Sequence, residues 1–204
     1  MPTLDGKRQV AGVVLAAGSS SRMGRNKLLL ELQGETLVRR AVKVALEAEL
    51  EPVLVVLGHE AERVEAALVG LSFETIMNPG YAQGMSGSLR LGIANVPQGA
   101  RAAIVLLADM PHVTAAMLRQ LVARHAQGGA SLVVSQYGEV IAPPALYDAS
   151  LFPDFASLVG DGCGRGVIRK HWDRAAFICW PEQALADIDR PQDFDAARSQ
   201  PVEG

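Results

Sequence analysis

Four short apolar runs, separated by segments of a different hydrophobic period, most constrain the fold of this chain. A continuous apolar run of this length is typical of a strand that is buried on both faces of a parallel sheet. The runs are Val10–Ala16, Val53–Leu57, Ala102–Leu107 and Leu132–Val134. They predict parallel strands in a sheet that is covered on both sides.

Two segments between these runs have the period of a helix. Thr36–Glu49 and Thr114–Gln127 each begin with a threonine that can cap a helix N-terminus. Their apolar stripes are Leu37, Ala41, Val44, Ala45 and Ala48 in the first, and Met117, Leu118, Leu121, Val122 and His125 in the second. Strands that alternate with helices predict right-handed crossovers and helices on both faces. We therefore expect an α/β fold, an open and mostly parallel sheet flanked by helices.

The chain is expected to form one domain over residues 1–204. Its 204 residues are 49% hydrophobic, which is enough for a core of its own. The alternation loosens from about Ser135 onward, where Pro143, Pro144 and the segment Gly160–Gly166 interrupt it. We expect a nucleotide-binding half over about residues 9–135 and an acceptor-binding half over about residues 136–204, ending in a helix over Pro191–Arg198.

The segment that follows the first predicted strand has the composition of an anion-binding loop. Leu15–Lys27 reads LAAGSSSRMGRNK, and it begins at the carboxyl edge of the sheet, where open α/β folds bind ligands. Small residues from Ala16 to Ser21 allow backbone N–H groups to approach an anion, and Arg22 and Lys27 add positive charge. The loop is therefore predicted to bind a triphosphate.

The spacing in this loop excludes two common phosphate motifs. A Walker loop requires GxxxxGK and then Ser or Thr, but five residues separate Gly18 from Gly24, and Leu28 follows Lys27. A dinucleotide loop requires GxGxxG, but three serines follow Gly18. The loop belongs to neither class.

Asp109 lies just beyond the apolar run Ala102–Ala108, so its carboxylate is expected at the same sheet edge as the loop. Mg²⁺ prefers one or two carboxylates together with phosphate oxygens and waters. Asp109 is therefore a candidate metal ligand, and the alternative is a turn or capping aspartate ahead of Pro111.

Five motifs, taken together and in this order, resemble those of the nucleotidyltransferases with a GT-A-like, Rossmann-like fold, and especially of their MobA-like branch. Within that branch the chain is most similar to the molybdenum cofactor cytidylyltransferases. The motifs are the loop Leu15–Lys27, NPGYAQGMSGSLRLGI at Asn78–Ile93, LLADMP at Leu106–Pro111, GDGCGR at Gly160–Arg165 and DIDRPQDF at Asp187–Phe194.

The resemblance implies a magnesium-dependent enzyme and a set of site residues. The LAAG form of the loop resembles that of members which use CTP as donor. Asp109 and Asp189 would bind the metal, although Asp189 is equally compatible with capping the Pro191 helix. Arg22, Lys27 and Asp109 would be catalytic, and the nucleotide would contact Leu15, Ala16, Ala17, Gly18, Ser19, Arg22, Lys27, Ser86 and Ser88. For Ser86, a plain helix cap is the alternative.

The same resemblance implies that Pro144, Asp161 and Arg165 bind the acceptor, which would be molybdopterin, and that a molybdenum oxidoreductase is a further partner. The chain departs from the family pattern here, because Cys163 and Gly164 replace the usual glycine and alanine, and Ala142 replaces a glycine. Two alternatives stay open: a cytidylyl- or uridylyltransferase that acts on a sugar or polyol phosphate, and a chaperone that matures a molybdenum enzyme without catalysis.

Charge and hydropathy exclude other partners. The formal charge is −3 and no basic run is present, which argues against nucleic acid and membrane surfaces as partners. The apolar run at Val10–Ala17 is too short to span a bilayer and leads into the glycine loop, unlike a signal peptide. We expect a cytoplasmic protein.

Overall fold

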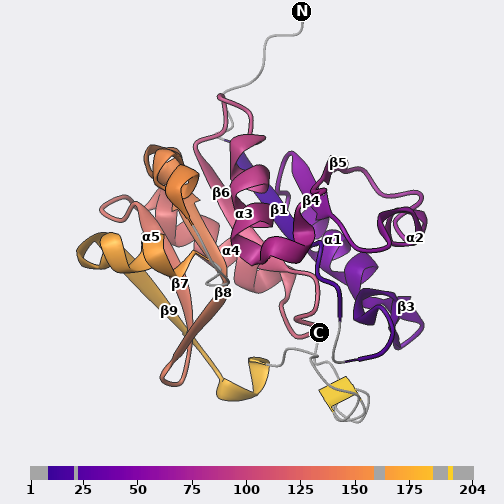
Figure 1. Cartoon of the computed structure of the whole chain (residues 1–204). Coiled ribbons are helices and arrows are strands. Elements are labelled where there is room, and N and C mark those ends of the chain that lie inside the picture. Colours follow the sequence, from indigo (N-terminus) through magenta and orange to yellow (C-terminus); the bar gives the residue numbers. More distant parts are fainter. Residues whose placement is uncertain (1–8, 21–22, 159–163, 186–192, 195–204) are drawn as a thin grey trace, which may run out of the picture.

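The computed structural model describes residues 9–20, 23–158, 164–185 and 193–194. Strands and α-helices alternate along the first two thirds of the chain (Figure 1). The strands are β1 (Val10–Ala16), β2 (Glu31–Leu32), β3 (Glu35–Thr36), β4 (Val53–Leu57), β5 (Glu74–Met77), β6 (Ala102–Leu107), β7 (Leu132–Tyr137), β8 (Val140–Asp148) and β9 (Ala175–Trp180). The α-helices are α1 (Leu37–Glu47), α2 (Ala61–Ala66), α3 (Met85–Ala94), α4 (Ala115–Ala126) and α5 (Arg165–Lys170). Short 3-10 helices are η1 (Lys27–Leu29), η2 (Tyr81–Gln83), η3 (Ala149–Ser157), η4 (Trp172–Arg174) and η5 (Glu182–Ala184).

Among the described residues, seven strands form one sheet in the order β5-β4-β1-β6-β8-β7-β9. β1 pairs in parallel with β4 on one side and β6 on the other, β4 pairs in parallel with β5, and β7 with β9. β8 runs antiparallel to both of its neighbours. The predicted open, mostly parallel α/β sheet is confirmed, and the four predicted strands are present as β1, β4, β6 and β7.

The sequence did not reveal β8, which lies in the middle of the sheet. Two consecutive prolines, Pro143 and Pro144, argue against a central strand because proline donates no ladder hydrogen bond. The chain accommodates them with a shift of register, since Val134 pairs with Ala145 but Ser135 pairs with Ala142. The two prolines thus fall between ladder pairs, where no backbone donor is needed.

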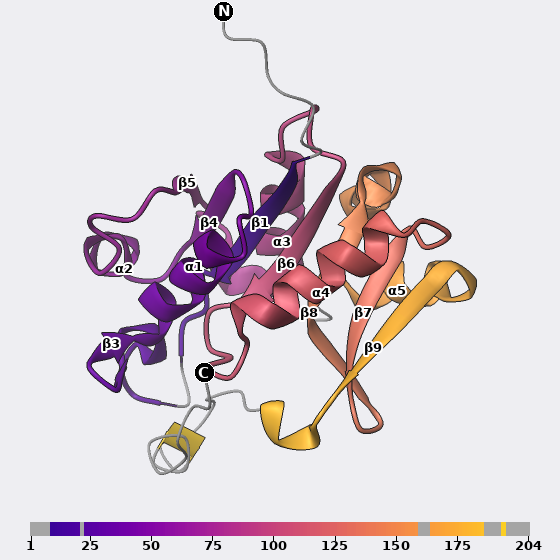
Figure 2. The same cartoon turned by 180° about the vertical axis from the view of Figure 1, so that it is seen from behind.

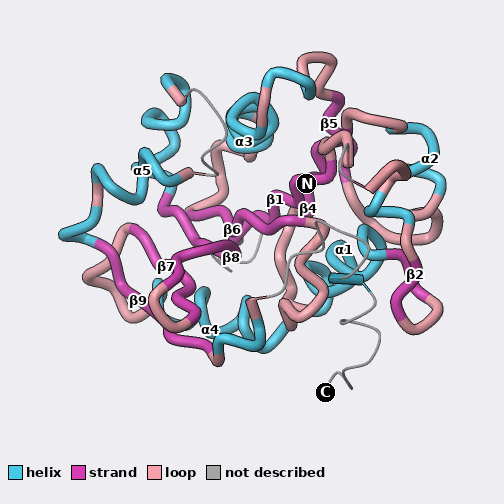
Figure 3. The backbone as a smooth tube through the Cα atoms, turned by 60° about the horizontal axis from the view of Figure 1, so that its bottom comes forward, coloured by secondary structure: helices cyan, strands magenta, loops and turns pink. Residues whose placement is uncertain are grey.

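Helices cover both faces of the sheet. Figure 3 shows α3 and α5 on one face and α1 and α4 on the other, and Figure 2 shows the α1–α4 face from the front. Each face has its own apolar cluster: one contains Val14, Val55 and Ile104, and the other contains Val13, Val56 and Val105. Burial on both faces explains why these strands are apolar throughout. Within the described residues, no helix is long and apolar enough to cross a membrane.

The two predicted helices are confirmed with Thr36 and Thr114 at their N-caps, but only Thr114 makes a side-chain capping bond. The Thr114 hydroxyl accepts a hydrogen bond from the Met117 N–H at 3.3 Å, as a capping threonine does. The Thr36 side chain makes no capping bond to α1. Thr36 is the last residue of β3 and pairs with Glu31, so the short hairpin and not the cap fixes its conformation.

A glycine lets α3 pack closely on β1. A Cβ atom added at Gly92 would lie 2.4 Å from Cγ1 of Val13, a strand residue with no exposed surface. Gly92→Ala should therefore lower the free energy of unfolding by about 1–3 kcal/mol, although alanine favours a helix more than glycine does.

Chemical denaturation of Gly92→Ala checks this prediction. The control is Gly99→Ala, because a Cβ atom there would meet nothing within 4 Å. We expect this variant to stay within about 0.5 kcal/mol of wild type. Equal stability of the two variants would mean that α3 does not approach β1 as closely as described.

Candidate functional site

The glycine loop leaves the sheet where three parallel strands end together. The Ala17 carbonyl at the start of the loop accepts a hydrogen bond from the His59 N–H, just beyond β4, at 3.3 Å. The Leu15 carbonyl accepts one from the Ala108 N–H, just beyond β6, at 3.2 Å. The start of the loop is thus fixed to both neighbouring strand ends, at the carboxyl edge that the sequence predicted.

Ser20 organises the loop from within. It has a left-handed backbone, with φ of 51°, and its carbonyl accepts a hydrogen bond from the Met23 N–H at 2.9 Å. Its hydroxyl accepts another from the Lys27 N–H at 3.1 Å. Asn26 then caps η1, because its side-chain oxygen accepts a hydrogen bond from the Leu28 N–H. These bonds fold the loop back, so that Lys27 returns to the sheet edge.

Lys27 and Asp109 form a close and largely buried charge pair. The Lys27 Nζ lies 2.5 Å from Oδ2 of Asp109, and the two side chains are only 12% and 16% exposed. The pair joins the end of the loop to the end of β6. The sequence had placed both residues at this edge, and the structure brings them into direct contact.

A second wall of the site is the segment between β5 and α3. Asn78 is buried, and its Nδ2 donates to the Ser88 hydroxyl at 2.9 Å while its Oδ1 accepts from the Gly80 N–H at 3.0 Å. Ser88 and Ser86 are both buried in α3. Asn78 therefore positions Ser88, a role that the sequence pattern alone left ambiguous.

The loop also borders an open cavity of about 560 Å³ on the side of α2. Ser19, Ser20, Arg25 and Asn26 line it together with the start of α2. The hydrogen bond from Arg63 lowers the pKa of the Glu60 carboxyl, so Glu60 is an anion there at neutral pH.

A separate cavity of about 220 Å³ lies next to Asp109. Leu107 and Met110, on either side of Asp109 in the chain, are part of its lining. The full lining is Met85, Val105, Leu107, Met110, Ile141, Ala142, Pro143, Ala145, Tyr147, Arg165, Ile168 and Leu185. Arg165 is the one charged side chain in this set. The other lining side chains are apolar apart from the Tyr147 hydroxyl.

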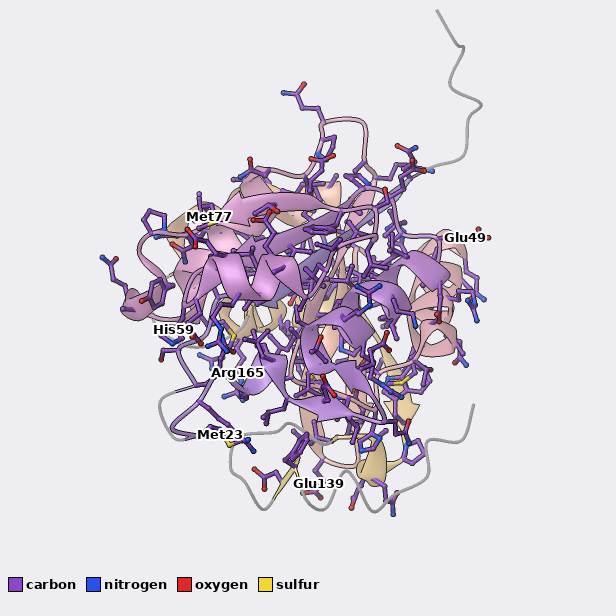
Figure 4. The ribbon with its side chains drawn as sticks, turned by 90° about the vertical axis from the view of Figure 1, so that its right-hand side faces the viewer. Met23, Glu49, His59, Met77, Glu139 and Arg165 are labelled. Atoms are coloured by element: carbon purple, nitrogen blue, oxygen red, sulfur yellow. The ribbon has the colours of Figure 1, made fainter. Side chains whose placement is uncertain are left out.

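Arg165 reaches this cavity because α5 begins there. Gly164 precedes it with φ of +72°, and a Cβ atom at Gly164 would lie 2.5 Å from the Tyr147 hydroxyl oxygen. A glycine is needed on both counts. Figure 4 shows Arg165 and Met23, a residue of the glycine loop, toward the same lower end of the molecule. Pro144 is buried behind the wall, and its neighbours Pro143 and Ala145 line the cavity.

Three predicted site residues, Arg22, Asp161 and Asp189, lie outside the described residues, as does most of the Pro191 helix. The end of the DIDRPQDF motif is described: Phe194 packs with Met23, Leu30, Leu32 and Leu37. This contact places Phe194, at the end of the last motif, beside the glycine loop. In the described part of the chain, no three His, Cys, Asp or Glu residues form a cluster that could hold a metal ion on their own.

The comparisons with known proteins agree with this geometry. Residues 12–175 match the MobA-like NTP transferase domain. The chain is 32% identical to the purine catabolism protein PucB of Bacillus subtilis, over 92% of this chain and 95% of that protein. It is 39% identical to a probable molybdenum cofactor guanylyltransferase of Opitutus terrae, over 58% of this chain and 62% of that protein. It is also 32% identical to the nicotine blue oxidoreductase of Paenarthrobacter nicotinovorans, over 88% and 92%.

Solved structures share the whole fold. The crystal structure of Rv0371c from Mycobacterium tuberculosis matches with a TM-score of 0.83 and 26% identity, over 94% of this chain and 98% of that one. Its complex with manganese matches with a TM-score of 0.77 and 25% identity, over 95% and 100%. With a glycine loop, a strand-end aspartate and a domain match that spans most of the chain, this protein belongs to the MobA-like NTP transferase family and is a nucleotidyltransferase.

Proposed function

We propose that the protein transfers CMP from CTP to molybdopterin and releases pyrophosphate. The observation that carries the proposal is the contact of Lys27 with Asp109 at the end of the glycine loop. A triphosphate in this loop would meet a cation and a carboxylate suited to a metal ion, which are the parts that phosphoryl chemistry needs.

The donor would occupy the loop and the wall formed by α3. We assign its phosphates to the backbone of Leu15, Ala16, Ala17, Gly18 and Ser19 and to the side chains of Arg22 and Lys27. Ser86 and Ser88 would contact the base or ribose, with Ser88 held by Asn78. The choice of CTP rests on the LAAG sequence of the loop. GTP is the competing donor, because one relative is named a guanylyltransferase.

A divalent metal ion fits the residues present. Asp109 offers one carboxylate at the strand end, and Mg²⁺ is held in such sites by one or two carboxylates plus phosphate oxygens. We propose Asp189 as the second ligand. Mg²⁺ would supply charge neutralisation on the triphosphate. The manganese complex of a structural relative supports a divalent ion, and magnesium is our choice among such ions.

The acceptor would occupy the apolar cavity beside Asp109. Its apolar side chains would pack against the fused rings of molybdopterin. Arg165 would pair with the acceptor phosphate, with Pro144 and Asp161 in the same region. A sugar or polyol phosphate is the alternative acceptor.

The transfer step needs no strong general base. The second pKa of a phosphate monoester is near ~6, so the acceptor oxygen is already ionised at neutral pH. That oxygen attacks the α-phosphorus of CTP, the bond from the α-phosphorus to the bridging oxygen breaks, and pyrophosphate leaves. Lys27 and Arg22 would neutralise the charge that grows on the leaving group. Residues about 9–135 would thus bind the nucleotide and about 136–204 the acceptor, in a cytoplasmic enzyme that supplies a molybdenum oxidoreductase.

The first test measures pyrophosphate release with each of the four triphosphates, Mg²⁺ and molybdopterin. We expect kcat/KM for CTP to exceed that for GTP by at least about tenfold, since a pocket for a one-ring base rejects a purine by overpacking. A polyol phosphate serves as the second acceptor. A preference for GTP would refute the donor assignment, and release with the polyol phosphate alone would refute the acceptor. No release with any combination would favour the chaperone alternative.

Lys27→Ala should lower kcat about 100-fold, because it removes a charge that stabilises the leaving pyrophosphate. The matched control is Lys43→Ala, since Lys43 also pairs with a carboxylate, that of Glu35 at 3.0 Å, but is 43% exposed. Turnover and thermal unfolding are measured on both variants. A folded Lys27→Ala enzyme with near-normal turnover contradicts the assignment.

The metal assignment predicts an order of effects. Asp109→Asn should impair the response of turnover to Mg²⁺ more than Asp189→Asn does, because Asp109 lies just beyond the end of β6. Titration of each variant with Mg²⁺ measures this. Equal or reversed losses would show that Asp189 is the principal ligand.

A further inference from the structure

Two hydroxyl groups behind the acceptor cavity have no role in the chemistry described above. Ser135 and Tyr137 lie on β7, and both are buried. Neither side chain lines the cavity. A buried polar group is costly unless it forms a hydrogen bond, so each needs a structural explanation.

Their partners are the carbonyls of the two prolines of β8. The Ser135 Oγ donates to the Pro144 carbonyl at 2.6 Å, and the Tyr137 Oη donates to the Pro143 carbonyl at 3.1 Å. Burial raises the pKa of the Tyr137 phenol, so this side chain remains a donor throughout the neutral and moderately alkaline range.

The register of the sheet explains why these bonds matter. The β7–β8 pairs pass from Val134–Ala145 to Ser135–Ala142, and the β6–β8 pairs end at Val105–Ala145. Pro143 and Pro144 are therefore paired in neither ladder. The two hydroxyls thus bond to the β8 backbone at Pro143 and Pro144, where β8 has no backbone pairing with β6 or β7.

The same segment is a wall of the cavity. Ala142, Pro143 and Ala145 line it, together with Arg165 and Met110. Any displacement of this segment would change the width of the cavity. It would leave the glycine loop and the Asn78–Ser88 contact unchanged, since these belong to other elements.

We infer that Ser135 and Tyr137 are positioning residues for the acceptor. Their hydroxyls hold the segment Ala142–Ala145 in place and so set the width of the cavity that the acceptor enters. This inference rests on the proposed function, in which the cavity takes the acceptor and the glycine loop takes the nucleotide.

The test uses Ser135→Ala and Tyr137→Phe in the full-length enzyme. We expect each variant to raise KM for molybdopterin about tenfold while KM for CTP changes less than about twofold, since each loses one buried hydrogen bond behind the acceptor wall. Ser150→Ala is the control. It removes the hydrogen bond of 2.7 Å from the Ser150 hydroxyl to Oδ1 of Asp148. Asp148 pairs with Ala102, the first residue of β6, at the end of that strand farther from Asp109. Both KM values should be unchanged in this control.

A second measurement separates the inference from the proposed function. Hydrogen exchange of the amides of Ala142 and Ala145, without substrates, should be about tenfold faster in Ser135→Ala and Tyr137→Phe than in wild type, because the wall opens more often. Thermal unfolding shows whether each variant is folded, and Tyr137→Phe alone suffices if Ser135→Ala does not fold.

The outcomes are distinct. The inference is overturned if hydrogen exchange of the Ala142 and Ala145 amides is unchanged in the variants. It is also overturned if KM for molybdopterin and KM for CTP rise in parallel, even if the enzyme transfers CMP as proposed. If the wild-type protein releases no pyrophosphate, the proposed function fails, and the exchange experiment alone then decides whether these hydroxyls hold the wall.

Discussion

The parallel pairing of β1 with both β4 and β6 is the constraint on which the rest of the structure depends. Because the three strands run in one direction, their carboxyl ends meet at one edge, and the residues that follow them become neighbours. The bonds from His59 to Ala17 and from Ala108 to Leu15 then fix the glycine loop to both flanking strands. Apolar side chains on both faces of β1 hold this arrangement by burial.

The Lys27–Asp109 contact follows from that edge and sets the electrostatics of the site. Taking a cation and an anion largely out of water costs free energy unless the two are paired, and their distance of 2.5 Å provides the pairing. In the proposed function the same carboxylate binds a metal ion, which would then compete with Lys27 for Asp109.

The second half of the chain adds a strand of opposite direction, and this strand lines the cavity that we propose for the acceptor. β8 enters the sheet antiparallel between β6 and β7, and its unpaired prolines form a wall that side-chain hydroxyls support. Gly164 then allows α5 to begin close to Tyr147, and Arg165, the first residue of α5, lines the same cavity. The cavity is therefore built from elements far apart in the chain, next to the strand end that carries Asp109.

The sequence by itself determined the elements whose signal is local. Continuous apolar runs indicated β1, β4, β6 and β7, and position after a strand indicated that the loop and Asp109 would share an edge. It did not indicate β8, because proline opposes a strand locally and only the shift of register against β7 makes room for Pro143 and Pro144. Nor did it indicate that Asn78 positions Ser88, or that Ser135 and Tyr137 bond to β8, since these partners are 10, 9 and 6 residues apart. The first pair meets only when α3 packs after β5, and the other two only when β7 and β8 are in register. Local propensity decides which segments are strands and helices, whereas contacts between segments decide which polar groups are satisfied, and that second step belongs to the tertiary structure alone.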